Sequence, residues 1–173
     1  AMLVGKNVRI RPLESDDLDW FTEWNNDISY TGAYEPVEVS SRHSIEKWFN
    51  DENRNSWWII ENLEAKPLGQ MITGPDGNNQ FLGYIIHPDN RNNGYCTEAV
   101  ELMVDYLFLS KSIVRVQTEV NPENKASIRV LEKAGFTFEG IRRKVAFMQG
   151  KYNDGAFYSI LRDEWTPRYL KAK

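Results

Sequence analysis

The pattern of apolar and polar positions predicts a chain of strands and helices. Residues 7–13 alternate between apolar and charged side chains, which is typical of a β-strand with one solvated face. A helix is expected from Ser15, because Asp16 and Asp17 follow it and apolar residues then recur at helical spacing. Ser41 is a suitable cap for another short helix. Further strands are predicted at residues 56–61, 67–73, 81–87 and 113–120, with helices after residues 88–97 and within 121–135, and with a strand pair around the turn at 149–151.

Residues 25–40, which we call the lip, follow neither the helical nor the strand period. Tyr30, Gly32, Tyr34 and Pro36 interrupt any regular pattern, so we expect a long loop or a broken helix here. Loops of this length in compact domains often carry function. The lip is therefore a candidate border of a substrate site.

The order of the predicted elements favours an α/β (α+β) fold. A strand and helices lead into a meander of three consecutive strands, and a helix, a strand, a second helix and a strand pair follow. A length of 173 residues is usual for one domain with its own core, and no repeat, low-complexity tract or linker divides the chain. We therefore expect residues 1–173 to form a single domain, in which Ala1 before Met2 is read as a remnant of an expression tag.

Composition and charge narrow the class of partner. The chain is 41% hydrophobic and 27% charged with a net charge of -4, so it has no general electrostatic attraction for nucleic acid. No stretch reaches the roughly 20 apolar residues that span a bilayer, so no membrane partner is expected. The single cysteine, Cys96, excludes an intrachain disulfide and fits a reducing, cytoplasmic location. One cysteine and two histidines also make a zinc site unexpected, so no metal is predicted.

The polar stretch from Pro88 to Val100 lies where a helix is predicted to begin, and its residues suit an anion. A helix N-terminus presents unpaired amide hydrogens and about half a positive charge. Gly94 lets the backbone approach a bulky anion, and Arg91 adds a fixed charge with several donors. Three short polar side chains add donors without crowding: Asn92, Asn93 and Thr97. A plain strand-to-helix turn uses the same residue types and remains the alternative. The stretch lacks the endings of a P-loop and of a dinucleotide fingerprint.

The series of motifs along the chain resembles the GNAT superfamily of acyl-coenzyme A N-acyltransferases, and its RimJ/RimL-type branch in particular. The cofactor loop of that family has the form Arg/Gln-x-x-Gly-x-Gly/Ala, which Arg91 and Gly94 match, while the small residue Cys96 stands at the last position. Three segments carry the resemblance in order, over roughly residues 8–165: YIIHPDNRNNGYCTEAV, NPENKASIRVLEKAGFTFEGIRR and GKYNDGAFYSILRDEW.

The resemblance implies acetyl-CoA as cosubstrate and a mixed, splayed central sheet flanked by helices. The sheet would open between the strand ending at His87 and the strand ending near Val120, with the pantetheine arm in the gap. The implied contacts are the backbone of Ile85, Ile86 and His87 for the pantetheine arm, the charge of Arg91 and the amides of Asn92, Asn93, Gly94, Tyr95, Cys96 and Thr97 for the pyrophosphate, and Asn124 and Ser127 for the pantetheine or thioester end.

Two residues are candidates for proton transfer in the implied reaction. Glu119 ends a predicted strand beside the gap, where several GNAT members carry an acid, so it is the candidate general base; a solvated strand face shared with Arg115 and Gln117 is the alternative. Ser127 matches the serine of the branch and is a candidate donor to the leaving thiolate; bonding to local backbone is its alternative. Many relatives carry a tyrosine acid one turn further on, where this chain has Leu131.

The resemblance implies an N-acetyltransferase that moves an acetyl group to a primary amine by direct attack in a ternary complex. The acceptor is a protein N-terminal α-amine or a small-molecule amine. An acyl-CoA-binding module without turnover is the alternative, and a nucleic-acid adaptor rests only on the basic residues 142–144. Cys96 is better explained as a small loop residue than as a covalent nucleophile, because no histidine stands in a readable relation to it. A homodimer is compatible with the sequence, which leaves the oligomeric state open.

Overall fold

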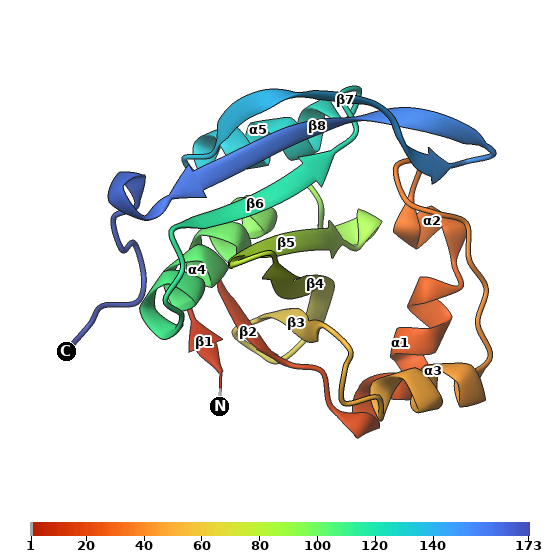
Figure 1. Ribbon diagram of the computed structural model, residues 1–173. Coiled ribbons are helices and arrows are strands. Elements are labelled where there is room, and N and C mark those ends of the chain that lie inside the picture. The colour runs from red at the N-terminus through yellow and green to blue at the C-terminus, as the bar shows by residue number, and fades with distance from the viewer. Residues whose placement is uncertain (1) are drawn as a thin grey trace.

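One mixed β-sheet runs through residues 2–173, which are the residues that this computed structural model describes (Figure 1). Its strands lie in the order β1-β2-β3-β4-β5-β6-β8-β7. The strands are β1 (Leu3–Val4), β2 (Val8–Pro12), β3 (Ser56–Asn62), β4 (Pro67–Asp76), β5 (Asn79–Ile86), β6 (Arg115–Val120), β7 (Thr137–Met148) and β8 (Lys151–Leu161). The helices are α1 (Leu18–Asn25), α2 (Ile28–Thr31), α3 (Arg42–Phe49), α4 (Tyr95–Ser110) and α5 (Lys125–Lys133). Ala1, interpreted above as a tag remnant, lies outside the described residues.

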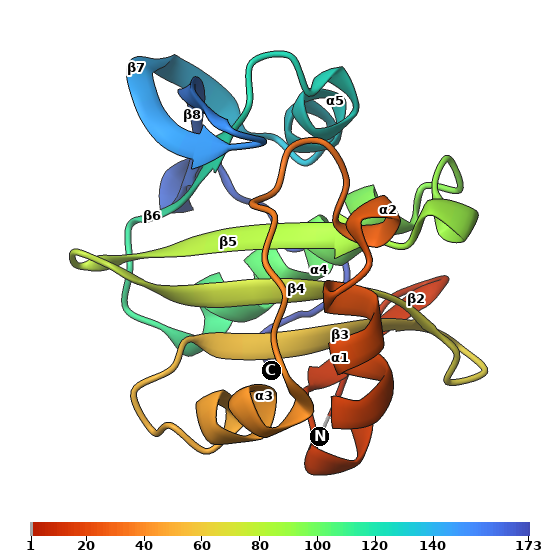
Figure 2. The same ribbon diagram turned by 90° about the vertical axis from the view of Figure 1, so that its right-hand side faces the viewer.

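The sheet opens between β5 and β6. Strands β3, β4 and β5 form the predicted antiparallel meander, and β6, β8 and β7 form a second antiparallel group. Strands β5 and β6 run parallel but pair only at Gln80 with Val116 and at Phe81 with Gln117. Figure 2 shows β7, β8 and α5 standing away from β5 as a result. The expected mixed, splayed sheet flanked by helices is confirmed.

Helix α4 packs against the sheet and joins its two parts in one core. Its residues Leu102, Met103 and Leu107 are fully buried, together with Leu82 of β5 and Leu131 of α5. Burial of each such side chain contributes roughly 1.5–3 kcal/mol relative to exposure. Among residues 2–173, no helix combines the length and the apolarity that crossing a bilayer requires.

The opposite face of the sheet is covered by α1 and α3. Successive residues of β3 face opposite sides, so Ile60 joins the α4 core while Ile59 joins a smaller cluster that includes Phe21 of α1 and Trp48 of α3. The lip follows α1, contains the short helix α2, and passes in front of β5, β4 and β3 before it reaches α3 (Figure 2). The lip therefore combines both predicted forms, a short helix and an extended loop.

The start of the first helix differs from the prediction. Ser15 is not the cap, because Ser15–Asp17 form a 3-10 turn in which Glu14 and Asp17 cap each other reciprocally, and α1 begins only at Leu18. Strand β1, which pairs with β2, was not predicted either. Two residues are too few to display a period.

Candidate active site

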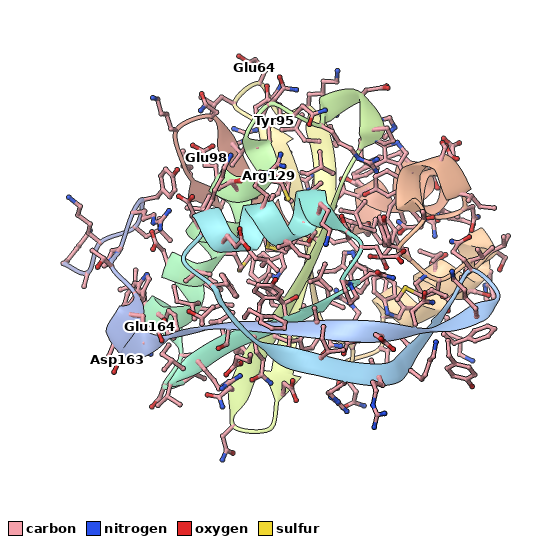
Figure 3. All side chains as sticks on the ribbon, turned by 90° about the horizontal axis from the view of Figure 1, so that it is seen from above. Glu64, Tyr95, Glu98, Arg129, Asp163 and Glu164 are labelled. Atoms are coloured by element: carbon pink, nitrogen blue, oxygen red, sulfur yellow. The ribbon has the colours of Figure 1, made fainter. Side chains whose placement is uncertain are left out.

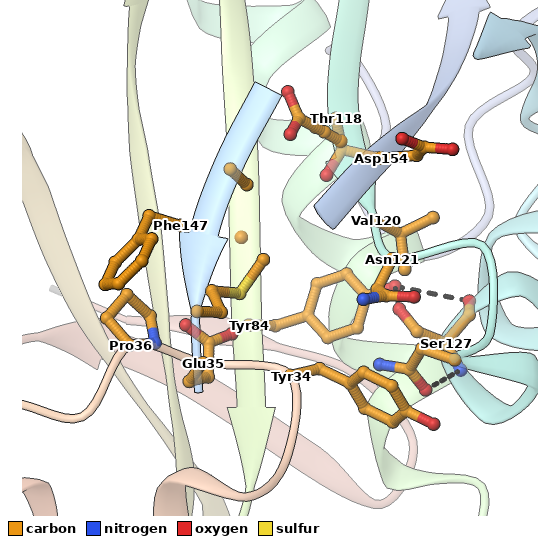
Figure 4. A pocket seen from close by; sticks show the side chains of 15 residues that line it. Tyr34, Glu35, Pro36, Tyr84, Thr118, Val120, Asn121, Ser127, Phe147 and Asp154 are labelled. Carbon is orange, nitrogen blue, oxygen red and sulfur yellow. Dashed lines mark hydrogen bonds between the residues drawn. The ribbon is translucent and has the colours of Figure 1, made fainter. Parts of the chain in front are cut away.

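A cavity of about 310 Å³ lies where β5 and β6 separate (Figure 4). It is bounded by the lip, by β5, by the end of β6 and the start of α5, and by the β7–β8 hairpin. The lining residues are Tyr34, Glu35, Pro36, Gly83, Tyr84, Thr118, Glu119, Val120, Asn121, Asn124, Ser127, Ala146, Phe147, Met148 and Asp154. Both residues predicted to move protons, Glu119 and Ser127, and the predicted thioester contact Asn124 are therefore brought together.

The lip is fastened to the two segments that border the cavity. The Tyr34 hydroxyl donates to the carbonyl of Glu123, which precedes α5, at 3.3 Å. Gln149, in the β7–β8 turn, donates through Nε2 to the carbonyls of Gly32 and Glu35 at 3.4 and 3.0 Å. The lip thus borders this cavity, and its contact with a substrate stays a prediction.

Glu119 lines the cavity from β6, where its side chain is exposed. Its side chain lies over Gly155 of β8, where an added Cβ would come within 2.5 Å of the Glu119 Oε1 atom. Desolvation by the surrounding atoms raises the pKa of Glu119, and the positive charge of Arg142 opposes this rise. A carboxylate with a raised pKa holds a proton more readily, which suits a general base.

Ser127 faces the cavity from the first turn of α5 and is paired with a tyrosine. The Ser127 Oγ atom and the Tyr84 hydroxyl share a hydrogen bond of 2.8 Å across the gap between α5 and β5 (Figure 4). Burial raises the pKa of Tyr84, so its hydroxyl stays protonated. Leu131, at the position of the absent tyrosine acid, is fully buried in the core. Tyr84 therefore supplies a phenol to this cavity from strand β5, whereas helix α5 supplies none.

Asn124 caps α5 and still faces the cavity. Its Oδ1 atom accepts a hydrogen bond from the Ser127 backbone amide at 3.2 Å, as an N-cap residue does. The Asn124 side chain thereby fixes the first turn of α5, on which Ser127 is carried. The Nδ2 group is the part of this side chain that remains to contact a ligand.

Glu35 is a third acidic side chain at this cavity, beside Glu119 and Asp154. It is half-buried on the lip, and burial raises the pKa of its carboxyl group to about 7. Among residues 2–173 its carboxylate has neither an ion-pair nor a hydrogen-bond partner, whereas Asp154 accepts from the Lys144 amide at 2.9 Å. Sequence reasoning missed both Glu35 and Tyr84. Glu35 stands in no motif, and Tyr84 opens the motif YIIHPDNRNNGYCTEAV without a role being assigned to its side chain, so only folding brings the two residues to this cavity.

The start of α4 fits the diphosphate of a nucleotide-like carrier. Gly94 precedes the helix with a φ of 75°, in the left-handed region, and has open space where a side chain would project. Helix α4 has 16 residues, and no side chain caps its N-terminus. The backbone amides of its first turn therefore lack intrahelical partners and point outward. The predicted cradle of Asn92, Asn93, Tyr95, Cys96 and Thr97 thus lies on one loop and the first turn of one helix. This arrangement suits the diphosphate of coenzyme A.

Arg91 differs from the expectation of a free phosphate ligand. Its Nε atom donates to the Ile86 carbonyl at 3.1 Å, and Nη2 donates to the Tyr30 carbonyl at 3.4 Å. Arg91 therefore ties the loop to β5 and to the lip. The positive charge of Arg91 stays near the loop, but two of its guanidinium nitrogens, Nε and Nη2, already donate to backbone carbonyls.

The predicted backbone contacts on β5 also need correction. The His87 amide donates to the Leu68 carbonyl on the far side of β5, and the His87 carbonyl accepts from the Asn90 amide, so neither group is free for pantetheine. Because ladder bonds alternate along a strand, Ile85 also directs its backbone groups toward β4. Tyr84 and Ile86 direct theirs into the gap. The Ile86 carbonyl already accepts from the Arg91 Nε atom, so the Ile86 amide and the backbone groups of Tyr84 are the ones left facing the gap, and their contact with pantetheine stays a prediction.

Cys96 is not an activated nucleophile. Burial raises the pKa of its thiol to about 12, so it stays protonated at neutral pH. It occupies the second position of α4 and packs against the core. The interpretation of Cys96 as a small loop residue agrees with this position.

A buried acid anchors the first turn of α4. The Glu98 carboxylate accepts from the backbone amides of Lys6, Asn7 and Val8 at distances from 2.7 to 3.1 Å. Glu98 and Tyr95 lie at the same end of α4 in Figure 3. The start of the helix is thus bonded to the N-terminal segment of the chain.

Comparison with known proteins agrees with this geometry. A family model for the acetyltransferase (GNAT) domain matches residues 7–137. The probable N-acetyltransferase YjcK of Bacillus subtilis (strain 168) is 31% identical in an alignment of 178 positions, gaps included, that covers 92% of this chain and 97% of YjcK. The match to YjcK therefore extends over nearly the whole of both proteins.

Two solved structures share the fold. Spermidine N-acetyltransferase from Vibrio cholerae, in complex with CoA and spermine, has a TM-score of 0.79 at 22% identity and covers 91% of this chain and 96% of its own. RimJ from Mycobacterium smegmatis, in complex with CoA-disulfide, has the same TM-score and identity and covers 91% and 83%. Both neighbours bind coenzyme A, which supports acetyl-CoA as the cosubstrate. This chain belongs to the GNAT acetyltransferase family, and it is an acetyl-CoA-dependent N-acetyltransferase.

Proposed function

We propose that this enzyme acetylates a primary amine that arrives as an ammonium ion, and that the transfer takes place in the cavity between β5 and β6. The observation that carries the proposal is the convergence of Glu119, Ser127 and Asn124 on one cavity beside the uncapped start of α4. Three carboxylates border this cavity, those of Glu35, Glu119 and Asp154, so a cationic acceptor is favoured over an anionic or neutral one.

The residues have distinct roles in this proposal. Bound acetyl-CoA supplies the activated acetyl thioester. Glu119 takes a proton from the attacking nitrogen, which its raised pKa favours. The Ser127 hydroxyl, held by Tyr84, donates a hydrogen bond to the leaving sulfur. Much of the acceleration comes from positioning, where well-oriented reactants gain on the order of 7–11 kcal/mol.

The acceptor is either a small-molecule amine or a protein N-terminal amine. The two solved neighbours have the same TM-score, so the shared fold does not choose between a polyamine enzyme and a RimJ/RimL-type enzyme. The acidic lining supports an acceptor with more than one positive charge. We place the enzyme in the cytoplasm, consistent with its single cysteine.

A panel of amines tests the proposal. The protein is mixed with acetyl-CoA and with spermidine, an aminoglycoside or a peptide with a free N-terminus, and release of the coenzyme A thiol is followed by a colorimetric thiol reagent. We expect release with at least one amine, and an acetylated product by mass spectrometry. Glu119→Gln should lower kcat by about 10²-fold or more, the typical contribution of a general base. Thiol release at background level with every amine would contradict the proposed function.

A further inference from the structure

We propose that Glu35 binds the acceptor ammonium group and takes its first proton, a role that rests on the proposed amine acetylation. Glu35 lines the same cavity as Glu119 and Ser127, and it enters from the lip, on the side opposite α5 (Figure 4). The acceptor and acetyl-CoA would thus meet between Glu35 and the Ser127 side of the cavity.

The lip holds Glu35 in place through its backbone. The Glu35 carbonyl accepts from Gln149 at 3.0 Å, and the neighbouring Tyr34 hydroxyl bonds to the loop before α5. The Glu35 carboxylate has no partner within residues 2–173 and faces the cavity. A half-buried carboxylate without a partner is stabilised when a cation enters, and a bound ammonium group supplies both the charge and up to three hydrogen bonds.

The surroundings of Glu35 suit proton transfer at neutral pH. Burial alone raises the pKa of Glu35 to about 7, close to the pH at which a base and its conjugate acid are both populated. The titratable groups that line the same cavity are Tyr34, Tyr84, Glu119 and Asp154. Nearby, burial raises the pKa of Tyr30, and the negative charge of Glu35 adds a smaller rise. Among these, Glu119 has a basic neighbour, Arg142, whereas no positive group lowers the pKa of Glu35.

The proposed step balances in protons and electrons. The ammonium group gives one proton to the Glu35 carboxylate and becomes a neutral amine with a free electron pair. The nitrogen forms a bond to the acetyl carbon, the carbon–sulfur bond breaks, and the sulfur leaves with the electron pair. Glu119 takes the second nitrogen proton. One of the two protons then neutralises the thiolate to give the thiol, and the other passes to solvent.

Glu35→Gln tests this role against Glu38→Gln, which removes an exposed carboxylate from the same lip. For each amine that the wild type acetylates, we expect Glu35→Gln to lower kcat/KM by about 10²-fold, mainly through a higher acceptor KM, with the KM for acetyl-CoA unchanged. The fall in rate below about pH 7 should disappear with the carboxylate. Glu35→Asp, which restores the charge, should recover part of the activity, and Glu38→Gln should behave as wild type.

A measurement without turnover completes the test. Carbon-13 NMR of labelled glutamate side chains should show one carboxyl that titrates near pH 7 in the wild type and is missing in Glu35→Gln. Adding an amine that the wild type acetylates should lower that midpoint, because a bound cation favours the carboxylate. An active wild type with a Glu35→Gln variant that matches Glu38→Gln in acceptor KM and pH profile would overturn the role of Glu35 alone. An inactive wild type would instead overturn the proposed function.

Discussion

Glu35→Gln should also change how stability depends on pH, independently of any activity. Burial raises the pKa of Glu35 from 4.5 in an unfolded chain to about 7 in the folded protein. Between these two values the folded state binds the proton more tightly than the unfolded state does. The free energy of unfolding of the wild type therefore decreases as pH rises through this window, and the decrease is complete above the folded pKa. Glutamine carries no proton and lacks this contribution.

The size of the effect follows from the two pKa values. A difference of one pH unit corresponds to about 1.4 kcal/mol, so the contribution of Glu35 falls by roughly 2–3 kcal/mol between about pH 5 and about pH 8. At about pH 8 the variant should therefore be the more stable protein by a similar amount, whereas near about pH 4, where Glu35 is protonated in the folded protein, the two proteins should be about equally stable. Glu119 also titrates with a raised pKa, but it is present in both proteins and cancels in the comparison.

Urea unfolding followed by the fluorescence of the six tryptophans measures both free energies at each pH. Glu38→Gln is the matched control, because Glu38 is exposed on the same lip and should leave the pH dependence of the wild type unchanged. If Glu35→Gln and wild type lose stability in parallel between the two pH values, Glu35 has an ordinary pKa. Its burial then does not raise its pKa.

Three further changes test other parts of the site. Tyr84→Phe removes the hydroxyl that holds Ser127 and should lower kcat about tenfold, with the KM for acetyl-CoA unchanged. A tenfold loss is expected for one hydrogen bond of about 1.4 kcal/mol. An unchanged kcat would show that the Tyr84–Ser127 hydrogen bond has no role in the reaction. Gly155→Ala places a methyl group against the Glu119 carboxylate. This variant should have a lower kcat, while its thermal unfolding temperature should shift little. Wild-type rates would mean that the carboxylate does not need its present position. Gly94→Ala forces an alanine into the left-handed region, which should cost about 1 kcal/mol of stability and weaken coenzyme A binding by calorimetry; equal affinity would count against this loop as the cradle.

Most elements could be predicted from the sequence because their patterns are local. The alternation in β6 and the apolar repeat of α4 depend on neighbours a few positions away, and the glycine after α5 ends that helix as predicted. Gly135 has a φ of 92°, and the Phe136 amide donates to the Leu131 carbonyl beyond it. Strand β1 escaped prediction because its two residues owe their conformation to β2 and not to their own sequence.

The candidate site was predictable only where a motif marks it. Glu119, Asn124 and Ser127 lie within segments whose spacing carries the family resemblance, so they could be found in order along the chain. Glu35 lies in a segment without a period, and only the folding of the lip over the sheet brings it to the cavity. Tyr84 lies within a motif, but its hydrogen bond with Ser127 joins residues 43 positions apart, and no local pattern in the sequence predicts it.

The sequence also could not predict the direction in which individual side chains and backbone groups point. A charged residue in a polar loop indicates an anion ligand, yet Arg91 uses part of its guanidinium to bind the carbonyls of Ile86 and Tyr30. Likewise, the sequence places His87 at a strand end but does not say which edge of the strand its amide faces. The pairing of β5 with β4 decides that question.

The three amide bonds that Glu98 receives from residues 6–8 give the first turn of α4 a fixed origin before any ligand arrives. A binding site that is already ordered loses little conformational entropy when its ligand binds, so most of the interaction energy contributes to affinity. We therefore expect residues 6–8, which lie 90 to 92 positions before Glu98, to affect how tightly coenzyme A is bound. Variation among relatives in those few residues should then tune cosubstrate affinity without altering a single phosphate contact.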